Sequence, residues 1–364
     1  MKHAHLTATL LSAFALTLCI TLPTHAAPRY TLSDLGEYVY PYDINNSGQW
    51  AGSANGYPVV FDGDRLASIC FPDQPLARGA ARCINNSGQV VGEIGHDAFL
   101  YSAGSLQTLS IPGARSTVAY GISDAGDVVG AIDFAQARAS GGYSGTFLYA
   151  AGQTTDLADA IHPGSHWGRA INSKKQIVGG IITQWGVNTR QTAFLRDNDS
   201  LSMLDNAFAE AYDINDAGQF VGDFSITGAR GRHAFLVSNG SLIDLGTLGD
   251  RPIATALHIN NRAQIVGISK WADMYIPEYP PPDFGHAFLY SAGPMYDLND
   301  RCVLPSNWVL REASALNDLG QIVGTADVGN RFSRRTHGFL LTAIPEPASL
   351  SLLLLPTLLL RRPR

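Results

Sequence analysis

The sequence predicts an all-β fold, a seven-bladed β-propeller with four strands in each blade. Three observations lead to this prediction. One motif occurs seven times at similar spacing, each copy divides into short strands joined by tight turns, and the composition suits strands. The chain of 364 residues contains 37 Gly and only 15% charged residues. Few charges with many Gly and β-branched residues favour a β-rich chain over a helical one.

The repeated motif places Asn or Ser before a tight turn and ends in a short apolar strand. Its copies are YDINNSGQWAG (42–52), RCINNSGQVVG (82–92), YGISDAGDVVG (120–130), RAINSKKQIVG (169–179), YDINDAGQFVG (212–222), LHINNRAQIVG (257–267) and SALNDLGQIVG (314–324). The equivalent residues are Asn45, Asn85, Ser123, Asn172, Asn215, Asn260 and Asn317. A period of about 45 residues is typical of four-stranded propeller blades.

Each unit contains signals for four strands. An apolar strand ends at the Asn, and the turn that follows uses residues that tolerate positive φ. A Gln-Val-Val-Gly type strand comes next, then a third strand such as AFLY at 98–101, then a fourth such as SLIDLG at 241–246. The third strand carries one Phe per unit, except in the first, where Val59 takes its place. We expect these to be core residues: Phe99, Phe147, Phe194, Phe235, Phe288 and Phe339.

The two ends of the repeat array favour a closed ring over an open β-solenoid. The last unit stops after its third strand, and a segment resembling a fourth strand, RYTLSDLG, lies at 29–36. Pairing of this segment with the strand at 337–342 would complete the last blade and leave no exposed sheet edge. We therefore expect the N-terminal strand to close the propeller.

The motifs INNSGQVVG, HAFLYSAG and DLG together resemble the HAF family of extracellular repeats, over most of residues 29–342. The resemblance implies an extracellular repeat protein with no established activity.

Both ends of the chain are expected to be targeting signals. A basic start, an apolar run from Leu6 to Leu22 and a small-residue site near Ala26 predict a signal peptide at 1–27, with an uncleaved membrane anchor as the alternative. The segment 343–364 contains Pro345, Glu346 and Pro347, a short Leu-rich stretch, and Arg361 and Arg362. It resembles a PEP-CTERM sorting signal. The Leu-rich stretch is shorter than the roughly 20 residues that span a bilayer, which suits a transient anchor.

The PEP-CTERM resemblance implies a Gram-negative producer of extracellular polysaccharide. It also implies processing near the tripeptide by an exosortase-type transpeptidase. The alternative is a hydrophobic tail without a role. The chain then divides into the signal peptide (1–27), the propeller (28–342) and the sorting signal (343–364).

The sequence gives no positive indication of catalysis, a metal or a cofactor. Nucleophile elbows, HExxH, Walker and dinucleotide motifs are absent. Histidines recur near the third strands, at His96, His233, His286 and His337. Because equivalent positions on different blades point outward around a ring, we expect them to make structural hydrogen bonds rather than to share a metal. The Asn/Asp/Gly turns lack the spacing of a Ca²⁺ loop.

The cysteine count allows one disulfide in the exported chain. Cys70 and Cys83 lie on either side of the connection between the first two blades, so we expect them to be bonded, the alternative being two buried thiols. The state of Cys302 is left open.

The second connection of each unit varies in length, which predicts a recognition face. It has three residues between Gly92 and His96 but eighteen between Gly267 and His286. The longest insert carries aromatic residues among prolines: Trp271, Tyr275, Tyr279 and Phe284. They are a candidate binding loop for sugars or proteins, or a loop that packs on itself.

These observations predict a secreted, non-enzymatic protein at the cell surface or in the extracellular matrix, after transient anchoring in the inner membrane. It would bind carbohydrate or protein and associate with extracellular polysaccharide. Residues 28–344 contain 21 Lys and Arg against 30 Asp and Glu, so nucleic acid is an unsuitable partner. The alternatives are a polysaccharide-active lyase or glycosidase with its site on the variable face, and a purely structural matrix protein. Clustered carboxylates or a Tyr/Arg/His group at the channel mouth would favour an enzyme.

Overall fold

The computed structural model describes residues 28–136, 142–157, 161, 164–184, 190–204, 208–225, 231–271, 285–330 and 333–345. The signal peptide, the sorting signal from Glu346 onward, and Tyr275, Tyr279 and Phe284 lie outside these residues.

The described residues form an all-β structure of six sheets, five antiparallel with four strands each and one with eight strands. The first three sheets are β2 (Val39–Ile44), β3 (Trp50–Ala54), β4 (Tyr57–Phe61) and β5 (Leu66–Ser68); β6 (Gly79–Ile84), β7 (Val90–Ile94), β8 (Asp97–Ser102) and β9 (Ser105–Leu109); and β10 (Ser116–Ile122), β11 (Val128–Asp133), β12 (Ser144–Ala150) and β13 (Gln153–Asp156). A fourth contains β14 (His166–Ile171), β15 (Ile177–Gln184), β16 (Arg190–Asp197) and β17 (Ser200–Met203).

The eight-stranded sheet contains two antiparallel groups joined by one parallel pair, Arg232 with Ile253. Its strands are β18 (Ala209–Ile214), β19 (Phe220–Ser225), β20 (Arg232–Ser238) and β21 (Ser241–Gly246), then β22 (Ile253–Ile259), β23 (Ile265–Lys270), β24 (His286–Tyr290) and β25 (Met295–Asp297). A 3-10 helix, η1 (Leu298–Asp300), follows. The last sheet contains β26 (Trp308–Leu316), β27 (Ile322–Asn330), β28 (Ser333–Ala343) and β1 (Tyr30–Glu37).

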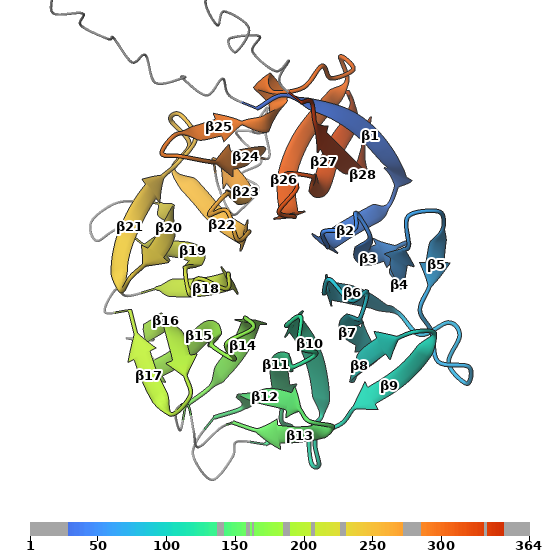
Figure 1. The fold of residues 1–364 in the computed structure, drawn as a ribbon, viewed down its shortest axis with the longest axis vertical. Helices are drawn as coiled ribbons and strands as arrows, with labels where there is room; N and C mark the ends of the chain where they lie inside the picture. The colour runs from blue at the N-terminus through green and yellow to red at the C-terminus, as the bar shows by residue number, and fades with distance from the viewer. Residues whose placement is uncertain are drawn as a thin grey trace, which may run out of the picture.

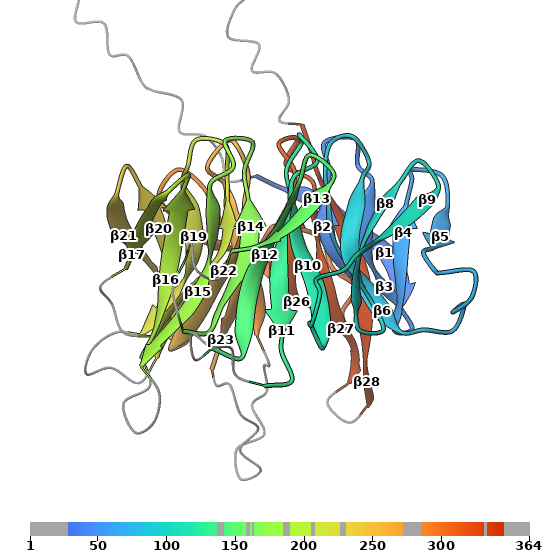
Figure 2. The same cartoon turned by 90° about the horizontal axis from the view of Figure 1, so that it is seen from below.

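The sheets are arranged around a central axis in a propeller-like fold (Figure 1). The first strand of each repeat lies innermost, and later strands lie progressively farther out (Figure 1). Seen from the side, the strands run roughly along the axis, so that turns gather on two faces (Figure 2). Among the described residues, no helix is long and apolar enough to cross a bilayer.

The strand nearest the N-terminus pairs with the strand nearest the C-terminus. β1 runs antiparallel to β28, from Tyr30 opposite Ala343 to Glu37 opposite His337. The His337 ring lies 3.0 Å from Asp34 Oδ1. The same His–Asp contact joins His233 to Asp244 and His286 to Asp297, so β1 occupies the position of a fourth strand. These three histidines are therefore structural, as the sequence predicts.

The recurrent Phe residues form the centre of the core. All six are fully buried, and Val59 is 3% exposed at the equivalent position. Each Phe faces a Gly of the second strand, because there is no room for a larger residue. A Cβ on Gly130, for example, would lie 2.6 Å from the Phe147 ring. The same Cβ would lie 2.0 Å from Val118 O of the first strand, so the neighbouring backbone and the Phe ring together require a Gly within the second strand.

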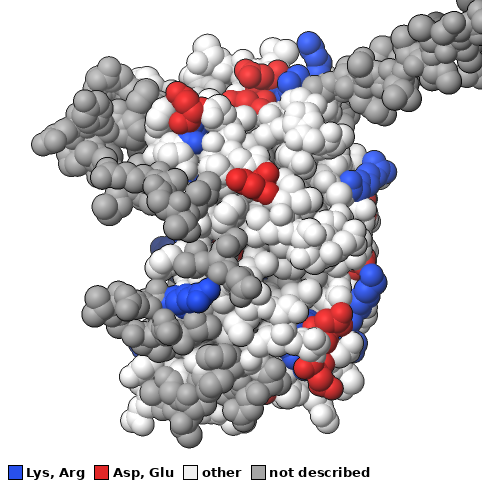
Figure 3. All heavy atoms as spheres, turned by 90° about the vertical axis from the view of Figure 1, so that its left-hand side faces the viewer, with Lys and Arg blue, Asp and Glu red and all other residues white. Residues whose placement is uncertain are grey.

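The two faces of the molecule differ. One carries the tight Asn-type turns and both ends of the described chain, where Ile344 N donates to Arg29 O at 2.8 Å. The other carries the ends at which second and third strands pair before and after the second connection, as at Asp133 with Ser144, Ser225 with Arg232 and Ser269 with His286. We call these the Asn face and the variable face. On the side drawn in Figure 3, charged side chains are scattered and form no continuous basic surface.

Candidate functional site in the central channel

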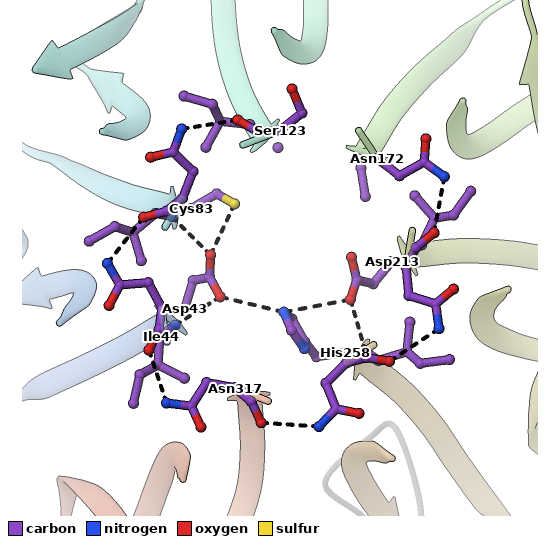
Figure 4. A pocket seen from close by; sticks show the side chains of 18 of the residues that line it. Asp43, Ile44, Cys83, Ser123, Asn172, Asp213, His258 and Asn317 are labelled. Carbon is purple, nitrogen blue, oxygen red and sulfur yellow. Dashed lines mark hydrogen bonds and ion pairs between the residues drawn. The ribbon is translucent and has the colours of Figure 1, made fainter. Parts of the chain in front are cut away.

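A cavity of about 250 Å³ lies on the axis at the Asn face. It is lined by the last residues of the innermost strands and by the turns that follow them (Figure 4). Every repeat contributes to its wall, so motif residues far apart in the sequence converge here.

An incomplete circle of hydrogen bonds surrounds the cavity (Figure 4). Each Asn at the start of a turn donates its side-chain amide to the main-chain oxygen at the equivalent position of the next repeat. The bonds join Asn45 to Asn85, Asn85 to Ser123, Asn172 to Asn215, Asn215 to Asn260, Asn260 to Asn317 and Asn317 to Asn45, at 2.9–3.1 Å. The last of these bonds links the last repeat to the first. We call this set the amide circle.

The same Asn side chains also fix their own turns. Asn45 Oδ1 accepts from the backbone N–H groups of Ser47 and Gln49, both at 3.0 Å. Its Nδ2 also donates to Gln49 Oε1 at 2.8 Å. A buried amide with all its hydrogen-bonding groups satisfied is strongly favoured over an unpaired one. This requirement accounts for the Asn and the Gln four residues later in the motif.

A second set of bonds runs parallel to the amide circle. The backbone N–H after each Asn donates to the side-chain oxygen of the equivalent residue in the next repeat, as Asn46 N does to Asn86 Oδ1 at 2.9 Å. Five further bonds of this kind involve Asn86, Ser173, Asp216, Asn261 and Asp318 as donors. Neighbouring repeats are thus joined at two levels.

Both sets are interrupted at one place, between the third and fourth repeats. Ser123 has no amide, and its hydroxyl instead accepts from Asp127 N at 3.2 Å. An ion pair between Asp127 and Lys175 Nζ, at 3.2 Å, spans the interruption. Lys175 has φ 63° in a position where Gly48, Gly88, Gly126, Gly218 and Gly320 stand in other repeats. The residues that depart from the motif on either side of this seam therefore contact each other.

A cluster of ionisable side chains occupies the centre of the cavity. His258 Nε2 lies 3.4 Å from Asp43 Oδ1 and 3.5 Å from Asp213 Oδ2. Asp43 also accepts from Cys83 Sγ at 3.0 Å and from the backbone N–H of Ile84 at 2.8 Å. Asp213 accepts from Ile259 N at 2.8 Å. One imidazole thus bridges carboxylates from the first and fifth repeats.

The surroundings of this cluster shift its pKa values. Burial disfavours the imidazolium, but the charge of Asp213 and the bond to Asp43 raise the pKa of His258 to about 9. Burial alone would raise the pKa of Asp43, yet its contacts with His258, Cys83 and Ile84 hold it below the usual value. Burial, with the nearby Asp43 charge, raises the pKa of Asp213. Burial also raises the pKa of the Cys83 thiol well above its usual value.

These contacts indicate a fixed ionic network rather than a reactive centre. The raised pKa of Cys83 favours its thiol, which is a weaker nucleophile than the thiolate. The raised pKa of His258 favours the imidazolium, in which Nε2 carries a proton. Within the part of the chain that the structure describes, no group of three or more His, Cys, Asp or Glu residues could hold a metal ion.

Tyr and Arg side chains alternate along the wall farther from the centre. Three residues before the motif Asn or Ser, the first five repeats carry Tyr42, Arg82, Tyr120, Arg169 and Tyr212 in turn. Both arginines are paired with carboxylates: Arg82 with Glu93 at 2.6 Å and Arg169 with Glu210 at 2.8 Å. The Arg169 guanidinium also lies 4.6 Å from the centre of the Tyr120 ring.

The predicted disulfide between Cys70 and Cys83 is wrong. Both thiols are free in the structure, as is Cys302. Cys83 lies near the end of β6, the innermost strand of its sheet, and lines the cavity. Cys70 is exposed and follows β5, the outermost strand of the preceding sheet. Nearness in sequence did not bring the two residues together, because an innermost and an outermost strand flank the connection. Cys302 instead donates to Leu298 O at 3.3 Å.

Of the candidate binding loop, only Trp271 is described. It stands at the start of the insert and is 43% exposed. The channel cluster of Asp43, Asp213 and His258 was not predicted from the sequence. The available signal was variation within the motif, because the position two before each Asn holds Asp, Cys, Gly, Ala, Asp, His and Ala in turn.

No protein-family model matches the chain, and no curated protein matches it in sequence. Solved structures are similar in fold. An acylaminoacyl peptidase in complex with Z-Gly-Gly-Phe-chloromethyl ketone is 11% identical with a TM-score of 0.51, covering 84% of this chain and 52% of that one. Pyrococcus horikoshii acylaminoacyl peptidase is 11% identical with a TM-score of 0.50, covering 85% and 52%. TolB from Acinetobacter baumannii has a TM-score of 0.42 at 9% identity, covering 71% and 62%.

The chain spans about half the length of the two peptidases. At this level of identity the likeness concerns the fold alone, and it agrees with a propeller-like arrangement.

Proposed function

We propose that the protein is a secreted, closed seven-bladed β-propeller that binds a partner at the cell surface without catalysing a reaction. Two contacts support closure: the pairing of β1 with β28, and the bond from Asn317 Nδ2 to Asn45 O at 2.9 Å. Both join segments from opposite ends of the chain. A ring held in this way offers a rigid frame on which loops can vary.

The observation that carries the binding role is the difference between the two faces. The Asn face repeats the same turns and the same hydrogen bonds, which fixes its shape. The variable face has connections of different length and exposes Trp271 and Tyr143, which are 43% and 53% exposed. Exposed aromatic rings on a rigid frame favour stacking on sugars or docking of proteins. Extracellular polysaccharide, or a protein that accompanies it, is the proposed partner.

The proposed destination rests on the targeting signals at the two ends and on the resemblance to HAF repeats. Residues 29 and 344 are adjacent on the Asn face. A sorting segment that follows Pro345 would therefore leave from this face, and the variable face would point away from the membrane. Mass spectrometry of the extracellular protein should give a C-terminus near Pro345 to Pro347. An intact Arg364 on protein from the medium would contradict the sorting proposal.

A glycan-array screen of the purified protein tests the binding role directly. We expect retention of one class of polysaccharide and no new reducing ends or unsaturated products after incubation with it. Absence of any glycan or surface-protein ligand would leave the purely structural matrix protein as the better account.

A polysaccharide-active enzyme is the second candidate, because the channel groups His258, two carboxylates and a Tyr/Arg wall. Two carboxylates whose pKa values move in opposite directions resemble the acid and base pairs of glycosidases. The cluster lies at the Asn face rather than at the variable face, and its members are already paired with one another. Release of products that stops in Asp43→Asn and Asp213→Asn variants would favour the enzyme.

A further inference from the structure

A second cavity, of about 280 Å³, lies in the seam between the third and fourth repeats. Its floor is formed by Val118 and Ala131 of the third repeat, and its wall on the fourth repeat by Trp167 and Arg169. Tyr120 and Ile132 also line it, as do Ser116, Asp133 and Ser144, which are register partners across β10, β11 and β12. We call this cavity the seam cleft. It opens toward the variable face.

The seam cleft coincides with the interruption of both hydrogen-bond sets. On the Asn face the same two repeats lack the amide bond that Ser123 cannot make, and the Asp127–Lys175 ion pair replaces it. The side chains that meet across the cleft are small on one side, where Val118 and Ala131 form the floor. The two repeats still approach closely at Gly121, where a Cβ would lie 3.0 Å from Ala170 Cα, so the cleft is a local space beside Val118 and Ala131.

The Trp167 indole is held rigidly at the wall of the cleft. Its Nε1 donates to Glu210 Oε1 at 2.7 Å. One side of the ring lies against Gly180, where a Cβ would stand 2.6 Å from the indole. Glu210 is in turn fixed by Arg169 and by Gln191 Nε2 at 3.1 Å. An indole fixed along its edge and against the backbone presents a flat surface at little entropic cost.

The polar groups of the cleft suit hydroxyls rather than charged ligands. Ser116 and Ser144 each supply a hydroxyl, and the Asp133 carboxylate is an acceptor at the rim, 48% exposed. The Arg169 charge is neutralised by Glu210 at 2.8 Å, so it does not offer a free cation. Asp133 lies 4.0 Å from Arg115 Nη1, so the charges at the cleft are paired and none is left free for a charged sugar. A neutral sugar would meet acceptors, donors and an aromatic wall.

We propose that the seam cleft binds one pyranose ring of a neutral glycan. Drug-sized ligands occupy pockets of about 300–1,000 Å³, so a cleft of about 280 Å³ suits a single ring. The inference rests on the proposed binding function and assigns it a position and a ligand class. The indole provides the apolar surface, the two serines and Asp133 bind hydroxyls, and the remainder of the glycan follows the variable face outward.

Isothermal titration of the purified protein tests the assignment. The probes are cellotetraose, maltotetraose, mannotetraose and laminaritetraose, with tetragalacturonate as the acidic counterpart. Ala131→Leu fills the cleft without removing a hydrogen bond, and Asp133→Ala removes the acceptor from an exposed position. We expect each to weaken binding of a neutral tetrasaccharide about tenfold or more, and more than Trp271→Ala does. Leu319→Ala, at an exposed position in a turn of the Asn face, should leave binding unchanged. Thermal melts establish that each variant is folded.

The outcomes separate the two proposals. Glycan binding that disappears in Trp271→Ala but persists in Ala131→Leu and Asp133→Ala would overturn the seam cleft and keep the binding function. Tighter binding of tetragalacturonate than of every neutral probe would overturn the neutral ligand class. Failure of all probes, together with an empty glycan array, would overturn both proposals.

Discussion

The seam between the last and first repeats and the seam between the third and fourth repeats are built in opposite ways. The first joins the two ends of the chain. It has the amide bond from Asn317, the bond between Asp318 N and Asn46 Oδ1 at 2.8 Å, and the β1–β28 ladder at the outer edge of the last sheet. The other lies within a continuous stretch of chain and has neither of the Asn-face bonds, which are replaced there by an ion pair with a 55% exposed Lys175. Its other hydrogen bonds lie away from that face, as between Thr146 and His166 at 2.9 Å.

The difference suggests how hydrogen bonds are distributed in a ring of repeats. Where segments from the two ends of the chain meet, every repeated contact is present. Where the chain runs on from one repeat to the next, the repeated contacts at the Asn face can be replaced by others. Exposed ion pairs contribute about 0–1 kcal/mol, so replacing the amide bond by the Asp127–Lys175 pair weakens this seam at the Asn face.

Removal of residues 28–37 should break the stronger seam and have the largest effect. It deletes β1, leaves the edge of β28 unpaired and removes buried Tyr30 from the core around Phe339. We expect a loss of about 5 kcal/mol or more in the free energy of unfolding, or failure to fold. Denaturant unfolding followed by tryptophan fluorescence measures it. Stability equal to that of the intact protein would contradict the closed ring.

Asn317→Ala should be the most damaging point substitution at a seam. It removes two donated and two accepted bonds from a side chain that is 3% exposed. The expected loss is about 3 kcal/mol. Ser123→Ala, at the equivalent position of the weak seam, is the matched control and should cost less than about 1 kcal/mol. Equal losses for the two variants would remove the distinction between the seams.

The charged His258 should make stability depend on pH. Its folded pKa is about 9, above the usual value for histidine, because Asp43, Asp213 and Asp318 face it. The stabilisation is therefore complete below about pH 6.5 and is lost as pH rises through 9; it amounts to at most about 3 kcal/mol. Melting temperatures between pH 6.5 and 9.5 should fall in the wild type. In His258→Asn, which lacks the titrating group, that fall should be absent.

Ser123→Asn combined with Asp127→Gln should have the smallest effect, and a stabilising one. The pair restores the amide and its glutamine partner, so the amide circle can be completed to Asn172 O. The gain of one buried hydrogen bond is about 1 kcal/mol, reduced by loss of the Lys175 ion pair. Lower stability would show that the repeats cannot approach closely enough at this seam. A gain accompanied by weaker glycan binding would link the seam to the cleft.

Much of the fold could be predicted because the same strand pattern occurs in every repeat. The Gly of the second strand pairs with the Phe of the third strand in every repeat that has both, so assigning the strands of one repeat also assigns those of the others. The sequence also indicates the partners of the recurrent histidines, since Asp34, Asp244 and Asp297 occupy the same position in the three fourth-strand segments. Asp34 lies before the first repeat, in the segment that resembles a fourth strand. Matching it with His337, as Asp244 matches His233, would have predicted from sequence that this segment pairs with the last repeat.

The channel cluster could not be predicted by the same reasoning. Equivalent positions on outer strands point away from one another, and that argument holds for His233, His286 and His337. Residues at the ends of the innermost strands instead converge on the axis, so Asp43, Asp213 and His258 meet although they belong to different repeats. The Cys70–Cys83 prediction failed for the complementary reason, because it took distance along the chain as distance in space.

Hydrogen exchange of the seven motif peptides tests the central claim most directly. Each peptide contains the same turn in the same position, so the copies control for one another. If the ring is closed by its end-to-end seam, peptides 42–52 and 314–324 should exchange as slowly as any copy, while 120–130 and 169–179 should exchange fastest. Rapid exchange at 42–52 and 314–324, with protection at 120–130 and 169–179, would contradict the account.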